Sequence, residues 1–187
     1  MPLAQPHPAV LRRAQRGDGD AFTEIVRSYQ VPVFNYVLRL TGDRPLAEDV
    51  TQEVFLRVLR GLPHFSGRST FTTWLFQIAK HRAYDELRTL ERRPHSTHSA
   101  EALDTLASVP VEPDGLIAHI WEAIGELDAD LRTALLLRDV VGLPYREIAA
   151  VLGVPLSTVK WRIFVARERV AGAVQPERVA ELLREVG

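Results

Sequence analysis

Apolar residues recur every three or four positions through the first half of the chain, the spacing of amphipathic helices that bury one face in a core. We expect a helix capped by Asp20, a second that starts at Pro32 and a third that starts after Asp43. The third ends at Gly61, and a fourth runs from about 71 to 90. The clearest core stripe belongs to the third helix, with apolar residues every four positions: Leu46, Val50, Val54, Val58 and Leu62.

The periodicity stops between 91 and 113, where Pro, Ser, Thr, His and acidic residues form a segment typical of a linker. Beyond it we expect amphipathic helices at 116–124 and 130–140, then two further helices at 144–152 and 157–170. No segment alternates like a strand. The pattern predicts an all-α fold of two helical domains joined by a flexible linker. The expected boundaries are a first domain at 1–93, an acidic linker at 94–113, a second domain at 114–175 and a short amphipathic tail at 176–187.

Charge is unevenly distributed along the chain. The net charge of the 187 residues is −1, yet residues 1–95 sum to +4, 144–170 to +3 and 96–143 to −7. Two basic lobes beside an acidic middle are compatible with a nucleic-acid partner despite the acidic total.

The chain has no cysteine, which excludes disulfides and thiolate metal sites and leaves any redox control to a partner. No run of about 18 apolar residues occurs, and residues 1–8 lack the apolar stretch of a secretory signal. We therefore expect a cytoplasmic protein without direct membrane insertion.

Residues 145–164 have the pattern of a helix-turn-helix, with Gly153 at the tight turn and Ser157 or Thr158 available to cap the second helix. On that second helix the expected buried stripe is Val159, Ile163, Ala166 and Val170. The outward face, with arginines at its flanks, would enter a major groove. The alternative is an ordinary helical hairpin, in which exposed Trp161 and Phe164 would form an unexplained apolar patch.

Several segments in register, at 46–60, 65–79, 85–88 and 157–167, resemble the extracytoplasmic-function (ECF) class of sigma factors of the sigma-70 family. The likeness covers nearly the whole chain. It implies that one helix of the first domain docks on the clamp helices of the largest subunit of RNA polymerase. The residues involved lie off the core stripe and form a mixed polar and apolar face: Asp49, Gln52, Glu53, Leu56 and Arg60. A merely solvated face is the alternative.

The loop at 64–70 and the helix after it resemble the family's element that reads and melts the minus-10 sequence. Loop residues would shape a pocket for an extruded base, and basic residues of the helix would hold the non-template strand. Phe71 and Trp74 are interpreted as core. The expected minus-10 residues are Phe65, Ser66, Gly67, Arg68, Ser69, Lys80, His81, Arg82 and Arg88.

The helix-turn-helix would read the minus-35 element. Trp161 stands where the family often has a small residue, and Val165 where it often has arginine. These two residues either contact thymine methyl groups or bind a protein partner, and the sequence leaves both open. The expected minus-35 residues are Ser157, Thr158, Lys160, Trp161, Arg162, Phe164, Val165 and Arg167.

The resemblance implies a sigma factor that binds core RNA polymerase and promoter DNA, double-stranded and melted, and that an anti-sigma factor inhibits. No cofactor and no catalytic activity are expected. The linker would thread the polymerase cleft or act as a passive tether. A stand-alone helix-turn-helix regulator is the main alternative and would bind duplex DNA tightly without polymerase. An enzyme is disfavoured, because His95 and His98 lack a third metal ligand and residues 17–20 form a turn and cap rather than a calcium loop.

Overall fold

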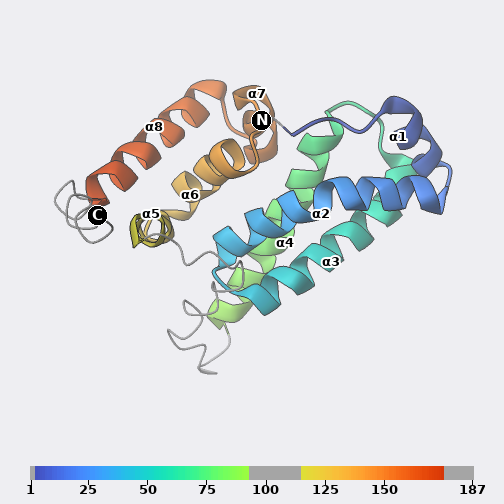
Figure 1. Cartoon of the computed structure of the whole chain (residues 1–187). Helices are drawn as coiled ribbons and strands as arrows, with labels where there is room; N and C mark the ends of the chain where they lie inside the picture. The colour runs from blue at the N-terminus through green and yellow to red at the C-terminus, as the bar shows by residue number, and fades with distance from the viewer. Residues whose placement is uncertain (1–2, 93–114, 175–187) are drawn as a thin grey trace, which may run out of the picture.

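A computed structural model describes residues 3–92 and 115–174, and all of its regular elements are helical. The expected linker and C-terminal tail, including His95 and His98, lie outside the described residues. The first domain contains α1 (Pro8–Gln15), α2 (Gly19–Thr41), α3 (Arg44–Gly61), the short 3-10 turn η1 (Leu62–His64) and α4 (Phe71–Arg92). Helices α2, α3 and α4 pack side by side, and α1 lies against one end of α2 (Figure 1).

Two expectations for the first domain are wrong. Asp18, not Asp20, caps α2, because its carboxylate accepts the N–H of Ala21 at 3.0 Å. The helix also continues through Pro32 instead of starting again there. Proline removes one backbone hydrogen bond, but Tyr29, Val33 and the buried residues after them keep one apolar face in the core on both sides of it. Burial of that face therefore outweighs the local cost of the proline.

The expected limits of α3 are confirmed. The Asp43 carboxylate accepts the N–H of Leu46 at 2.9 Å, and Val50, Val54 and Val58 are buried as the stripe predicted. The fourth helix begins one residue after Thr70, whose hydroxyl accepts the N–H of Thr73 at 3.2 Å and so caps α4. This cap fixes the point at which the loop at 64–70 ends.

The second domain contains α5 (Gly115–Gly125), α6 (Ala129–Leu135), the π-helical turn η3 (Leu136–Val140), α7 (Tyr145–Leu152) and α8 (Leu156–Ala173). Gly153 adopts φ +70° and ends α7, as expected for the turn of a helix-turn-helix. The expected cap of α8 is wrong. Pro155 holds that position with an extended backbone, which leaves Ser157 and Thr158 inside the first turn.

The two domains pack directly on each other, and their buried side chains form one continuous core. Helix α7 lies on α4, while η3 and α5 contact α2 (Figure 1). The Arg39 guanidinium of α2 stacks 3.6 Å from the ring centroid of Trp121 in α5, and burial lowers its pKa. Across 3–92 and 115–174, no single helix is long and apolar enough to span a membrane. Helices α7 and α8 together have the length and composition of a possible span, but they are bent by 102° relative to each other.

Candidate nucleic-acid interface

The outward face of α8 is the most exposed apolar surface of the second domain. Trp161 and Phe164 have exposed fractions of 60% and 63%, and Lys160 and Ser157 beside them are also exposed. Val165 does not share this face fully, because it is half-buried and packs against the core. Of the expected buried stripe, Val159, Ile163 and Ala166 are buried, whereas Val170 is half-buried at the edge of the core. The helix therefore exposes two large aromatic rings and a lysine to solvent.

Three arginines of α8 form ion pairs with aspartates of their own domain. Arg162 pairs with Asp130 and Arg169 with Asp128 at 2.7 Å, while Arg167 donates through Nη2 and Nε to the two carboxylate oxygens of Asp139 at 2.6 and 3.1 Å. The hydrogen bond to Asp139 raises the pKa of Arg167. Thr158 lies half-buried in the first turn of the helix. The Arg162 side chain is largely buried in its ion pair, with an exposed fraction of 16%, whereas Arg167 and Arg169 remain exposed.

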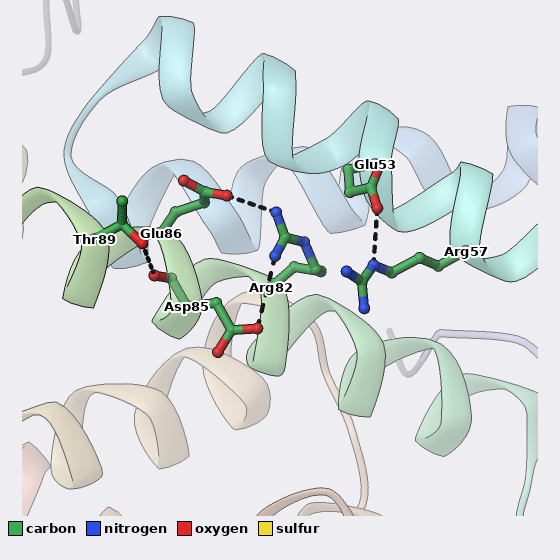
Figure 2. Close-up of polar contacts among 6 residues, drawn as sticks. All are labelled: Glu53, Arg57, Arg82, Asp85, Glu86 and Thr89. Atoms are coloured by element: carbon green, nitrogen blue, oxygen red, sulfur yellow. Dashed lines mark hydrogen bonds and ion pairs between the residues drawn. The ribbon is translucent and has the colours of Figure 1, made fainter.

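The outer face of α3 combines polar and apolar side chains. Asp49, Gln52, Leu56 and Arg60 are exposed, and Glu53 is half-exposed. Glu53 accepts a hydrogen bond from Arg57 at 2.9 Å, which lowers its pKa (Figure 2). Two apolar residues that we did not single out also belong to the exposed surface of this domain, Leu59 of α3 at 47% and Val31 of α2 at 58%. The signal that identifies them is exposure of a large apolar side chain, which only the packed structure reveals.

The loop at 64–70 borders a cavity of about 670 Å³. Phe65 packs against the ring of Trp74, with 4.9 Å between centroids, and its carbonyl accepts a hydrogen bond from Gln15 at 2.9 Å. Ser66, Gly67 and Arg68 are exposed, and Ser69 is half-buried. Helix α7 and the N-terminal segment complete the walls of the cavity. The sequence predicted the loop, but it did not predict that α7 and the N-terminal segment lie against it.

The four basic residues expected to hold DNA on α4 divide into two pairs. His81 and Arg88 are exposed and line a cavity of about 300 Å³. Arg82 is largely buried and pairs with Asp85 at 3.6 Å and Glu86 at 2.5 Å (Figure 2). Lys80 donates to the carbonyl of Val151 in α7 at 2.8 Å, and burial lowers the pKa of its ammonium group. His81 and Arg88 are therefore accessible to solvent, whereas Lys80 and Arg82 are bound by other groups of the protein.

No group of three His, Asp or Glu side chains within the described parts of the chain is arranged to hold a metal ion. At residues 17–20 the Asp18 carboxylate caps α2 and pairs with Arg13 at 2.7 Å, so this segment forms a turn and cap. The candidate site consists of three surfaces: an aromatic face on α8, a mixed face on α3, and a loop and basic helix beside a cavity.

Comparisons with known proteins agree on one family. Residues 25–93 match the profile described as Sigma-70 region 2, and residues 118–170 match Sigma-70, region 4. The RNA polymerase sigma-H factor of Pseudomonas aeruginosa is 36% identical over 94% of this chain and 95% of its own length. The ECF RNA polymerase sigma-E factor of Escherichia coli is 37% identical over 89% of this chain and 93% of its own.

Two solved structures share the fold. CnrH, in complex with the cytosolic domain of CnrY, has a TM-score of 0.69 at 25% identity and covers 88% of this chain and 94% of its own. The sigma factor RpoE of Bartonella quintana, in complex with the anti-sigma factor NepR, has a TM-score of 0.66 at 21% identity and covers 82% of this chain and 96% of its own.

Proposed function

We propose a division of labour between the two domains from the premise that this chain belongs to the ECF class of the sigma-70 family. As a sigma factor it directs transcription initiation by RNA polymerase and is not an enzyme, since the polymerase carries out the chemistry. We assign residues 1–93 to polymerase binding and the minus-10 element and 114–175 to the minus-35 element, with 94–113 as linker and 176–187 as tail.

The exposed face of α3 is the proposed contact with the clamp helices of the largest polymerase subunit. Asp49 and Gln52 supply hydrogen-bonding groups, and Leu56 supplies apolar area that binding would remove from water. The exposed Leu59 extends the apolar part of this face. Glu53, oriented by Arg57, supplies a fixed carboxylate at its side.

The loop at 64–70 and α4 are proposed to read and hold the melted minus-10 element. Exposed Arg68, His81 and Arg88 are available to DNA as they stand. Lys80 must first release the Val151 carbonyl, and Arg82 must exchange Glu86 for a phosphate or else serve by orienting that part of α4. The loop side of the cavity, at residues 65–70, is the proposed site for an extruded base.

The outward face of α8 is proposed to enter the major groove at the minus-35 element, with Trp161 and Phe164 toward the bases and Lys160 toward a phosphate. The same face could fill a groove of an anti-sigma factor. In the similar solved structures, CnrH is in complex with the cytosolic domain of CnrY, and the sigma factor RpoE with the anti-sigma factor NepR; we propose that a comparable anti-sigma factor controls this chain. We propose that this sigma factor acts in the cytoplasm, where the polymerase works.

The observation that carries the proposal is the pair of exposed aromatic residues on the second helix of a helix-turn-helix, in a chain whose family binds promoters. The test is transcription of a promoter library by core polymerase with and without this protein, followed by sequencing of the transcripts. We expect transcripts that share a minus-35 and a minus-10 motif. Tight duplex binding without polymerase, and no added transcripts with it, would instead identify a stand-alone regulator.

A further inference from the structure

One carboxylate of the second domain contacts three hydroxyl groups of the first, in addition to the apolar core that the two domains share. Glu147, in the first turn of α7, places its Oε2 atom 2.9, 2.6 and 3.2 Å from the hydroxyl oxygens of Thr70, Thr72 and Thr73. Thr72 and Thr73 are buried, with exposed fractions of 0% and 1%. Hydrogen bonds to a charged acceptor are stronger than those between neutral groups, more so where water is excluded.

The position of this carboxylate is favourable for a second reason. The three threonines form the N-terminus of α4, where Thr70 is the cap. The N-terminus of a helix carries partial positive charge, which stabilises a nearby anion. Glu147 therefore sits where α4 attracts negative charge most strongly, although it belongs to the other domain.

Further contacts continue along the same face of α4. Gln77 donates to the carbonyl of Ala150 at 2.9 Å, and Lys80 donates to that of Val151 at 2.8 Å. Tyr84, one turn further, donates to the carbonyl of Ala129 at 3.0 Å. The intervals from Thr73 to Tyr84 are three or four residues, so these side chains lie on one helical face. The second domain covers that face from the loop to the middle of α4.

We propose that the described arrangement is a self-inhibited form, in which the second domain covers the minus-10 surface and Glu147 latches it closed. The inference rests on the proposed function, because it takes the loop at 64–70 and Lys80 as part of that surface. While α7 stays in place, it engages the Lys80 ammonium group through the Val151 carbonyl and covers one side of the loop at 64–70. The protein must open at this contact before it holds the melted strand, and opening exposes the three hydroxyls as well.

The test compares the full-length chain with its Glu147→Ala variant. Because the chain has no cysteine, Ser28→Cys on α2 and Ala171→Cys on α8 allow spin labels on two exposed sites without background. We expect the wild type to give one narrow distribution of distances between the labels and Glu147→Ala to give a broader and longer one. Glu168→Ala is the matched control, since it removes one carboxylate from the exposed side of α8 and should leave the distances unchanged.

The second readout is affinity for a fluorescent single-stranded oligonucleotide that carries the minus-10 motif recovered from the promoter library. Apparent affinity scales with the open fraction, so Glu147→Ala should bind about tenfold more tightly and Glu168→Ala as the wild type does. Thr72→Val, which removes the nearest hydroxyl from the other domain, should act in the same direction. Adding it to Glu147→Ala should have little further effect on the label distances, because the Glu147 variant already lacks the hydrogen bond between the domains that Thr72→Val removes.

Unchanged label distances in both Glu147→Ala and Thr72→Val would overturn the latch, and so would longer distances without tighter binding of the oligonucleotide. Circular dichroism of each variant checks that it is folded. If Glu147→Ala unfolds, the label distances and the oligonucleotide affinity of Thr72→Val test the proposal. Failure of the proposed function has a different signature: label distances that respond to the variants as expected, together with equal binding of the motif and a scrambled oligonucleotide.

Discussion

Trp161 and Phe164 expose large rings to water on the helix that the family uses to read DNA. If Trp161 contacts thymine methyl groups, Trp161→Ala should cost roughly 1–3 kcal/mol at one or two positions of the minus-35 element and relax specificity there. A selection of minus-35 variants against the wild type and Trp161→Ala measures this. Identical base preferences at every position would assign the residue to a protein partner instead.

Lys160 lies next to Trp161 in the sequence but is expected to act on the DNA backbone. Lys160→Ala should weaken binding evenly across minus-35 sequences, because a phosphate contact carries no base information. The slope of log affinity against log salt should fall by about 1, the contribution of one neutralised phosphate. Binding titrations at several salt concentrations give the slope, and a change confined to particular bases would show that Lys160 reads sequence.

On α3, the combined change of Asp49, Gln52 and Glu53 to alanine should weaken association with core polymerase while the helical content stays the same. The three side chains point away from the buried stripe, so their removal leaves the core intact. A pull-down with core polymerase measures association, and Glu24→Ala on the exposed side of α2 is the control. A loss of helical content would show that the three residues are needed for the fold. Unchanged binding to core polymerase would show that they are not part of the interface.

Among the expected helix caps, which were Asp20, Asp43 and Ser157 or Thr158, only Asp43 is confirmed by the structure. Asp43→Ala removes the acceptor for the Leu46 N–H and should lower the free energy of unfolding by about 1 kcal/mol. Asp43→Asn keeps an acceptor oxygen at this position and should retain most of the wild-type stability. Urea unfolding followed by circular dichroism compares the variants. Equal midpoints for the wild type and Asp43→Ala would mean that the cap does not limit the stability of α3.

The loop at 64–70 tests the division of labour across the whole molecule. Its replacement by the corresponding loop of another family member should change the preferred minus-10 bases and leave polymerase affinity unchanged, because the face of α3 is untouched. Sequencing of transcripts from the promoter library reads out the preference. A minus-10 preference that follows the second domain instead would refute the assignment.

The sequence by itself determined the helices, the two-domain organisation and the helix-turn-helix, because amphipathic spacing and turn residues such as Gly153 act over one or two turns of chain. The α3 stripe and the exposure of Trp161 follow from the same spacing. Local signals also misled where packing outweighed them, as at Pro32, inside a helix that its buried face holds together.

Only the tertiary structure decided which expected site residues are accessible. Arg82 is largely buried between acidic neighbours, Val165 is half-buried and Lys80 is bound to α7. The contact of Glu147 with the threonines at the start of α4 joins residues more than 70 positions apart. Such contacts have no periodicity in the sequence, because they depend on how two separately formed helical units pack, and that packing is set by the shapes and charges of whole faces.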